Sequence, residues 1–405
     1  MTEHSPKSYM PSSERVLHMA LASSSFFKSV MVFSLRSVRK RSWSRQSGHD
    51  HSSQVLLYAI NFVRAMLYPL SALFDPIKFV ILLVHSFILF KRYKPLFVIA
   101  SMPPLEIGLS AWLLAKRKTS KLIIDLRDDW ESAREVQLGR YFPARIFRAL
   151  SMVSKKIYSD ALVVFVATST IAYNIGRRGV TTQTLLVPNG ADTSIFVPQN
   201  ESVRKRIRAK YNLPLDKVIL VYCGSGTISY YRLDIILSCV KFLPKEVKDK
   251  IYVVLYVYSG AKQLKQMLSK LGIADKIVDI RDPLPRKNLA ELLRACDVGI
   301  VPFDSDAYLL CARSTKLYEY LSSGLYVISS GPKRGELDMF FSANPALGLF
   351  IHPTVDDFAR SLNHILETTE DLFSDNLRKL RHSFIKRNYD RKSIMETTMK
   401  ALLER

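Results

Sequence analysis

Short apolar runs alternate with amphipathic stretches along most of the chain. From residue 95 onward, compact runs rich in β-branched and aromatic residues are each followed by a longer segment with helical spacing. In the first half, strands are expected at 95–101, 121–129, 161–169 and 184–190, and helices at 105–115, at 146–158 and before Gly179. Short strands that alternate with helices predict an α/β fold with a parallel, doubly wound sheet.

The same alternation restarts after a polar stretch near residue 200. Strands are expected at 217–226, 251–260, 276–282, 298–303 and 325–331, helices at 233–243, 261–271, 289–297 and 314–324, and closing helices at 355–367 and beyond Arg378. The chain should therefore hold two α/β halves of comparable size. We expect a basic N-terminal segment and two Rossmann-like domains, followed by helices that cross back to the first domain: 1–52, 53–198, 199–375 and 376–405.

The first 52 residues are the part that the pattern describes least. They are rich in serine and end in a basic run, while the apolar stretches 16–22 and 30–35 each fit a short strand or a helical turn. A disordered basic arm and a structured start both stay open. The first fifteen residues are polar, so no secretory leader of the usual layout is expected.

Residues 55–90 are strongly apolar but are interrupted by Arg64, by Pro69 and by the Asp75-Pro76 pair. The longest apolar run, 79–90, is shorter than the ~20 residues that a membrane-spanning helix needs. Two helices are therefore predicted. They can be core helices of the first domain, or the first can lie partly in a bilayer interface with Lys91, Arg92 and Lys94 near lipid phosphates, and the two interpretations are compatible.

The charge balance narrows the class of partner. The chain has 405 residues with 59 Lys and Arg against 36 Asp and Glu, a net charge of +23. Such an excess suits nucleotide diphosphates, an anionic membrane surface or nucleic acid. Nucleic acid is not expected, because the chain has no zinc spacing, no basic region followed by heptads and no RNP-like motif. The four cysteines are scattered singly, which argues against a zinc site or a disulfide framework and indicates a reducing cytosol.

Ligands of doubly wound sheets bind at the carboxyl ends of the strands, so the residues that follow each strand matter most. Gly224 and Ser225 lie in the glycine turn that the strand expected at 217–226 enters. Their backbone amides can meet a phosphate, although glycine is also common in tight turns for geometric reasons alone. This feature by itself does not separate the two interpretations.

The helix expected at 314–324 has a more specific start. Ser314 or Thr315 should cap it, and the free N–H groups together with Lys316 would form an anion site suited to a diphosphate. Glu319 lies one turn further and can accept hydrogen bonds from the vicinal hydroxyls of a ribose. The alternative is a Lys–Glu pair on a solvated helix face, which contributes ~0.2–0.5 kcal/mol.

Three segments resemble the family 4 glycosyltransferases of the GT-B fold: VPNGADTSIFVP (187–198), LAELLRACDVGIVPF (289–303) and STKLYEYLSSGLYVISS (314–330). The last resembles the branch with an SKLxEYL-type motif, which acts on lipid-linked or surface glycans. LIIDLRDDW (122–130) and SDALVVFVATS (159–169) resemble the amino-terminal domain of that branch. The resemblance extends from about residue 55 to the C-terminus and implies two facing, doubly wound domains.

The resemblance also implies an activity. Members transfer a sugar from a nucleotide-sugar donor with retention of configuration, generally without a metal or a cofactor. A hexosyl or N-acetylhexosaminyl transfer from a UDP- or GDP-linked donor to a glycan or polyprenyl-linked acceptor is implied, in cell-surface polysaccharide or glycoconjugate synthesis. The donor would bind the second domain and the acceptor the first, with the enzyme cytoplasmic and peripheral on the inner face of the cell membrane.

Residue by residue, the resemblance assigns Glu319 to the donor ribose and Lys316, with Ser314 and Thr315, to the diphosphate. Gly224 and Ser225 would face the leaving phosphate.

The other implied positions are Arg281 and Leu284 near the nucleobase, and Asp128 with residues 101–103 on the acceptor side. Asp128, Lys316 and Glu319 would form the catalytic set. Arg127 fits a structural salt bridge as well as a substrate contact.

The chain departs from the family pattern at three places. Cys311 stands where many members carry a second glutamate, eight residues before Glu319, and Arg232 is the one basic residue after the strand at 217–226, slightly out of register. Residues 1–54 contain a single glycine, Gly48, although a glycine-rich loop normally ends the first strand. A GT-B sugar-nucleotide epimerase and an inactive glycan-assembly scaffold therefore stay as alternatives.

Overall fold

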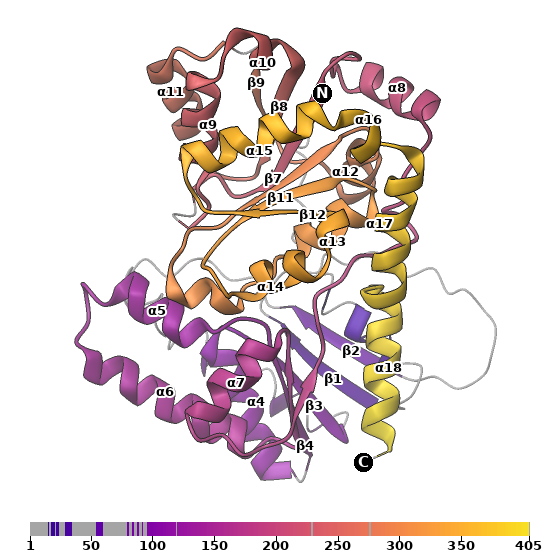
Figure 1. Ribbon diagram of the computed structural model, residues 1–405. Coiled ribbons are helices and arrows are strands. Elements are labelled where there is room, and N and C mark those ends of the chain that lie inside the picture. The colour runs from indigo at the N-terminus through magenta and orange to yellow at the C-terminus, as the bar shows by residue number, and fades with distance from the viewer. Residues whose placement is uncertain are drawn as a thin grey trace, which may run out of the picture. The chain divides into compact units, whose positions relative to one another are not determined.

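The computed structural model describes residues 15, 18–20, 22–23, 79–80, 83–84, 87–88, 91, 95–118, 120–227, 230–274 and 277–404, and the backbone of 29–34 and 54–59. The described residues fall into two compact units (Figure 1). One comprises Asn189–Arg391, and the other comprises the described residues up to Pro188 together with 392–404. The contacts thus divide the chain at Pro188, whereas the sequence pattern placed the division after residue 198.

The first unit contains a six-stranded parallel sheet in the order β2-β1-β3-β4-β5-β6. Its strands are β1 (Ser29–Ser34), β2 (Gln54–Ala59), β3 (Phe97–Met102), β4 (Lys121–Leu126), β5 (Val163–Val166) and β6 (Thr184–Leu186). Its helices are α4 (Leu105–Lys118), α5 (Trp130–Leu138), α6 (Ala144–Ser159), α7 (Ser169–Arg177) and α18 (Arg391–Leu403). The parallel arrangement follows from the alternation of strands and helices, since a parallel pair needs a long crossover.

One prediction for this unit is wrong. Residues 55–59 form part of β2, which pairs with β1, although a helix was expected there. A short apolar run bordering polar residues fits a buried strand as well as a helix, and periodicity alone does not separate them. The described residues of 79–91 are helical, as expected. The basic run before residue 52 lies outside the described residues.

The core of the first unit brings together distant parts of the chain. Phe97 and Ile99 of β3 pack in one buried cluster with Met19, and with Met395 and Met399 of α18. Near them, the buried Arg15 pairs with Asp125 at 2.6 Å, and Ser101 donates to the same carboxylate at 3.0 Å. The final helix and a short N-terminal helical segment are therefore parts of this unit.

The second unit contains another six-stranded parallel sheet, in the order β12-β11-β10-β7-β8-β9. Its strands are β7 (Val218–Gly224), β8 (Ile251–Val257), β9 (Val278–Arg281), β10 (Val298–Pro302), β11 (Tyr326–Ser330) and β12 (Gly348–Ile351). Its helices are α8 (Glu201–Lys210), α9 (Leu233–Phe242), α10 (Lys245–Lys250), α11 (Ala261–Leu271), α12 (Arg286–Leu293), η1 (Ala307–Cys311), α13 (Thr315–Ser322), α14 (Glu336–Ala343), η2 (Pro345–Leu347), α15 (Val355–Glu367), α16 (Thr369–Leu372) and α17 (Asp375–Asn388).

Both faces of this sheet are covered by helices, as Figure 1 shows. Alternate residues of β7 enter two different cores: Ile219 and Val221 pack in one, Leu220 and Tyr222 in the other. Burial on both faces explains why the strands appear in the sequence as continuous apolar runs. The strand order reverses where β7 lies beside β10, and ligands of such sheets bind at the carboxyl ends of the strands at that point.

Candidate functional site

Helix α13 is fixed closely against the point where the strand order reverses. A Cβ atom on Gly299 of β10 would lie 2.3 Å from Cδ2 of Tyr320, so glycine is needed for the helix to approach the strand this closely. The hydroxyl of Tyr320 accepts a hydrogen bond of 2.8 Å from the backbone N–H of Cys223 in β7. Helix α13 is thereby anchored through Tyr320 to both β10 and β7.

Lys316, in the first turn of α13, carries its ammonium group into an aromatic setting. Its Nζ lies 4.2 Å from the ring centroid of Tyr222 and 3.9 Å from that of Tyr231. A Cβ atom on Gly224 would lie 2.7 Å from the same Nζ, so a glycine leaves room for the ammonium group. Among the described residues, this buried Nζ has no hydrogen-bond partner. Burial lowers the pKa of Lys316 to about 7, while Cys223 and Glu319 act in the opposite direction.

Glu319 is buried as well, with an exposed fraction of 3% against 7% for Lys316. The alternative of a Lys–Glu pair on a solvated helix face is therefore wrong. Oε1 of Glu319 lies 3.8 Å from Nη2 of Arg391, and that nitrogen also donates to the carbonyl of Gly190 at 2.6 Å. Nη1 of Arg391 is buried without a hydrogen-bond partner in the described part of the chain. Cations with unused donor capacity thus flank the Glu319 carboxylate.

The first turn of α13 leaves donors available. Ser314 is the residue before the helix, as predicted, but its side chain makes no capping hydrogen bond. The N–H of Leu317 is bonded to the carbonyl of Ser314 at 3.2 Å, and the N–H groups of Thr315 and Lys316 precede it at the positive end of the helix. The start of the helix and the Lys316 ammonium group therefore point to one anionic ligand.

The loop after β7 is held by hydroxyl groups. Ser225 Oγ lies 2.7 Å from Ser259 Oγ and 3.2 Å from Thr227 Oγ1, and Tyr222 donates to the carbonyl of Ser225 at 2.8 Å. These contacts tie the ends of β7 and β8 together and place Gly224 against Lys316. The structure thus places Gly224, Ser225, Lys316 and Glu319 near one another, and their roles in donor binding stay predictions.

Two other predicted site residues are engaged within the protein. Arg232 lies at the start of α9, and its guanidinium group is held by Asp234 at 2.9 Å and by Asp304 at 3.3 Å. Arg281 bonds Asp279 at 2.6 Å and donates to the carbonyl of Tyr211 at 2.5 Å. Their roles in donor binding remain predictions, and the contacts seen here anchor loops of the second unit.

One further predicted site residue of the second unit, Leu284, is apolar, and Cys311, where the chain departs from the family pattern, is buried. Leu284 packs against the core that contains Val221 and Leu317. Cys311 is buried at the end of η1. Its thiol stands where many family members carry a second glutamate, so this position supplies no carboxylate. Among the described residues, no group of three His, Cys, Asp or Glu side chains could hold a metal ion.

The acceptor-side residues of the prediction belong to the first unit. Asp128 is exposed in the loop after β4, whereas the neighbouring Asp129 is buried and pairs with Arg178 at 2.6 Å. Arg127 donates to the carbonyl of Pro103 at 2.8 Å, a contact that braces the loop after β3. The structure does not test the role of Asp128 in the reaction.

Sequence reasoning missed Tyr222, Tyr231 and Arg391. Tyr222 is one of several aromatic residues in apolar strands, and Tyr231 lies in a loop without a recognisable spacing. Arg391 is 72 positions beyond Glu319, so only the fold brings the two together. No short motif in a single sequence carries these three contacts.

The sequence of the second unit is similar to that of known proteins. Residues 203–391 match the family described as Glycosyl transferases group 1. A D-inositol 3-phosphate glycosyltransferase of Xylanimonas cellulosilytica is 28% identical over 134 residues, 31% of each chain. A second, from Thermomonospora curvata, is 28% identical over 144 residues, 32% of this chain and 33% of the relative. The chain thus aligns with about a third of the length of these curated relatives.

Solved structures place the fold of the whole chain. Sucrose-phosphate synthase from Thermosynechococcus elongatus superposes with a TM-score of 0.71 at 18% identity, over 97% of this chain and 92% of that one. Anabaena Alr3699/HepE in complex with UDP-glucose gives a TM-score of 0.60 at 14% identity, over 80% and 81%. Residues 203–391 therefore carry the sequence pattern of the group 1 glycosyltransferases, and the two parallel sheets form the predicted GT-B fold.

Proposed function

We propose that this protein is a glycosyltransferase that moves a hexosyl or N-acetylhexosaminyl group from a UDP- or GDP-linked donor to a glycan or polyprenyl-linked acceptor, with retention of configuration. The reaction would serve cell-surface polysaccharide or glycoconjugate synthesis. Support for the reaction class comes from the family match of residues 203–391. The solved complexes of Alr3699/HepE with UDP and with UDP-glucose have the same fold and support the choice of donor.

One observation carries the proposal. The Lys316 ammonium group is buried at the start of α13 beside Gly224 and has no hydrogen-bond partner in the described part of the chain. A buried cation without a partner costs stability, and a diphosphate would supply the missing acceptors. Glu319, one helical turn away, is an acceptor suited to the two hydroxyls of a ribose. The pair therefore matches the two ends of a nucleoside diphosphate.

The chemistry follows from these positions. The bond between C1 of the sugar and the diphosphate oxygen breaks, and a bond forms between C1 and the acceptor oxygen on the same face. The acceptor proton passes to an oxygen of the leaving phosphate. Lys316 and the first N–H groups of α13 stabilise the charge that develops on the leaving diphosphate, which is the largest contribution expected of such a site.

Donor binding tests the assignment. Titration calorimetry of the full chain with UDP- and GDP-sugars should show binding that Lys316→Met and Glu319→Gln each weaken by about tenfold to a hundredfold, because each removes a charge-assisted contact. Lys265→Met, at an exposed lysine of α11, is the matched control and should keep the wild-type affinity. Equal affinity in all variants would refute the site. A nucleotide-sugar that isomerises without acceptor would identify an epimerase instead.

We also propose that the enzyme is cytoplasmic and binds the inner face of the cell membrane from one side. Val80, Val84 and Ile88 are helical and four residues apart, and each exposes more than half of its surface. Lys91 follows them, and its Nζ lies 4.9 Å from the ring of Phe87. Within the residues searched, which are the described ones, no helix is long and apolar enough to cross a membrane. An apolar helical face next to basic residues suits the interface of an anionic bilayer.

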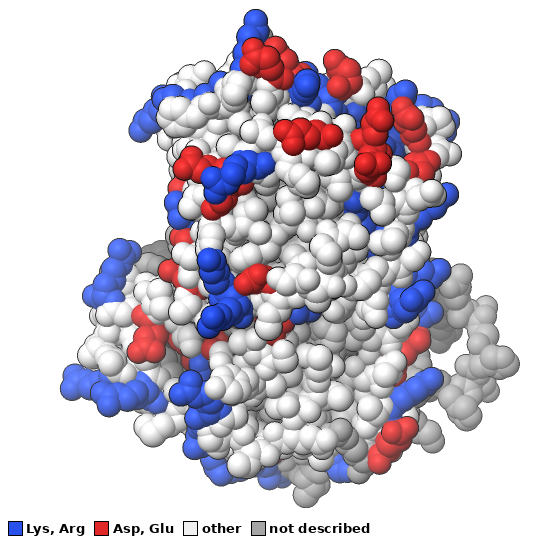
Figure 2. Space-filling view, viewed as in Figure 1, with Lys and Arg blue, Asp and Glu red and all other residues white. Residues whose placement is uncertain are grey.

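Vesicle flotation tests this part. Wild-type protein should float with anionic liposomes at low salt, and a Val80→Ser, Val84→Ser, Ile88→Ser variant should float less. Figure 2 shows Lys and Arg side chains at several places on the visible face, and high salt should weaken the electrostatic part of binding. Absence of binding at both salt concentrations would remove the membrane proposal and leave the donor site unaffected.

A further inference from the structure

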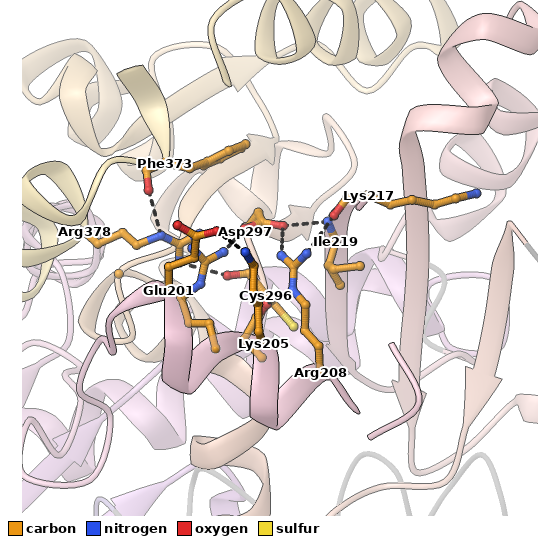
Figure 3. A network of polar contacts seen from close by, with 12 residues as sticks. Glu201, Lys205, Arg208, Lys217, Ile219, Cys296, Asp297, Phe373 and Arg378 are labelled. Carbon is orange, nitrogen blue, oxygen red and sulfur yellow. Dashed lines mark hydrogen bonds and ion pairs between the residues drawn. The ribbon is translucent and has the colours of Figure 1, made fainter. Parts of the chain in front are cut away.

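A second cluster of charged residues lies in the second unit at the amino ends of the strands, opposite the carboxyl ends that carry the candidate donor site. Asp297 directly precedes β10 and is buried. Its carboxylate accepts hydrogen bonds from Arg208 and Arg378, each at 2.6 Å, from Arg204, and from the backbone N–H of Ile219 at 2.8 Å. Figure 3 shows the side chains of Arg208 and Arg378 converging on Asp297.

The cluster holds more positive than negative charge. Three buried guanidinium groups share the single carboxylate of Asp297. Glu201 is another acid of this region, but its side chain is 70% exposed and pairs with Lys205 at 2.7 Å. Burial lowers the pKa of Arg378 to about 9, and Arg204 adds to the effect while Asp297 opposes it. A second anion would therefore relieve repulsion among the guanidinium groups.

The three arginines differ in how fully they are bonded. Arg208 also donates to the carbonyls of Ala295 and Lys217, each at 3.0 Å, and Arg378 to those of Phe373 at 3.2 Å and Cys296 at 3.0 Å. Arg204 makes one side-chain hydrogen bond, to Asp297, and its buried Nε has no partner within the described residues. Arg204 is thus the member with donors to spare.

Arg204 borders a hollow of about 500 Å³ that opens at this edge. Five basic residues, three acidic residues and five others line it: Arg204, Lys205, Arg208, Lys217 and Lys250; Glu201, Asp216 and Asp297; Leu215, Val218, Leu366, Thr369 and Phe373. Lys217 and Lys250 directly precede β7 and β8. The hollow therefore lies at the amino ends of the strands, roughly 20 Å from Gly224 at about 3.3 Å per strand residue.

We propose that this hollow binds a small, soluble, phosphorylated molecule, with Arg204 and the two lysines Lys217 and Lys250 holding the phosphate. Arginine and lysine side chains are suited to phosphate oxygens, and Arg204, which lines the hollow, keeps a buried Nε without a partner within the described residues. The apolar lining around Phe373 would accommodate the organic part of the molecule. This site is separate from the donor site and does not depend on the proposed reaction.

Helix α17 links the two places. It carries Arg378 of the cluster, and it packs against α13, which carries Lys316 and Glu319. Arg381 of the same helix donates to the carbonyl of Gly324, just after α13, at 3.2 Å. An anion in the hollow would therefore act on the helix that supports α13.

Calorimetry of the full chain with pyrophosphate, at constant ionic strength and with saturating UDP present, tests the proposal. The wild-type protein should bind pyrophosphate. The double variant Lys217→Ala, Lys250→Ala should bind it about tenfold more weakly, because it loses two partly exposed charge contacts. Lys265→Ala combined with Lys270→Ala removes the same charge from exposed positions of α11 and should leave the affinity unchanged.

Arg204→Gln is the second variant. Asp297 keeps Arg208, Arg378 and the N–H of Ile219, so the fold should persist, which the melting temperature checks, while pyrophosphate affinity falls at least tenfold. No binding to wild-type protein, or equal binding by the lysine variants and their control, would overturn the proposal. If the protein floated with phosphatidic acid vesicles and this binding depended on Lys217 and Lys250, the ligand would be a lipid headgroup, and the proposal of a soluble ligand would be overturned.

Discussion

The ammonium nitrogen of Lys316 lies 3.9 Å from the centre of the Tyr231 ring, and it has no hydrogen-bond partner among the described residues. Tyr222 covers the same nitrogen from 4.2 Å. Cation–π contacts of this kind contribute roughly 0.5–2 kcal/mol, less than the cost of desolvating an ammonium group. The protein thus holds a cation ready for an anion that must come from outside.

Gly224→Ala should weaken binding of the nucleotide. The added Cβ would lie 2.6 Å from the hydroxyl of Tyr222 and 2.7 Å from Nζ of Lys316, so the ring and the ammonium group would both have to move. We expect a loss of affinity for UDP of at least tenfold, measured by calorimetry. Gly176→Ala, whose Cβ would meet no atom within 4 Å, is the control and should bind UDP like the wild type. Wild-type affinity in Gly224→Ala would contradict the contact.

The affinity for UDP should depend on pH through Lys316. Its pKa is about 7 in the free protein, and a diphosphate binds the charged ammonium form. Below pH 7 the lysine is already charged, whereas above pH 7 binding requires uptake of a proton. Affinity should therefore fall from pH 7 to 9, by at most about tenfold per unit. Titrations in buffers of different ionisation enthalpy would count the protons, and a profile unchanged in Lys316→Met would contradict the assignment.

The contribution of Glu319 to UDP binding should depend on the ribose hydroxyls of the ligand. UDP should bind the wild type more tightly than its 2′,3′-dideoxy analogue by roughly tenfold, because the analogue lacks the two hydroxyl groups that would donate to the Glu319 carboxylate. In Glu319→Gln the two ligands should bind about equally, since a neutral amide loses the charge-assisted contacts. A preference for UDP that persists in the variant would assign the ribose contact to another residue.

The arginines around Asp297 should differ in their effect on stability. Arg208→Met removes hydrogen bonds to Asp297 and to several carbonyls, and should cost about 3–5 kcal/mol of unfolding free energy. Arg204→Met removes one bond and leaves the carboxylate paired, so it should cost clearly less. Urea denaturation of both variants measures the difference, and equal losses would show that Arg204 is as much a part of the internal network as Arg208.

Strands that are buried on both faces could be predicted from the sequence. Strands β7, β8 and β10 are buried on both faces and appear in the sequence as unmistakable apolar runs bounded by turns. Residues 54–59 are equally apolar, but the run continues into a segment with helical composition, and nothing local marks where the strand ends. Pairing of β2 with β1, a tertiary contact, decides the outcome.

The candidate site was predictable where a motif carries it and not elsewhere. Lys316 and Glu319 lie on one helix, so their spacing is visible in the sequence. The burial of Lys316 between two tyrosines and the pairing of Glu319 with Arg391 depend on how β7, β10 and the chain after α17 are assembled. The choice between a solvated ion pair and a ligand site therefore needed the structure.

The most direct test is an experimental structure of the protein with UDP bound. We predict that a β-phosphate oxygen lies within hydrogen-bonding distance of Nζ of Lys316 and of the first N–H groups of α13, with both ribose hydroxyls on Glu319. A nucleotide bound elsewhere, with the Lys316 ammonium group still enclosed by Tyr222 and Tyr231 and without a partner, would contradict the account.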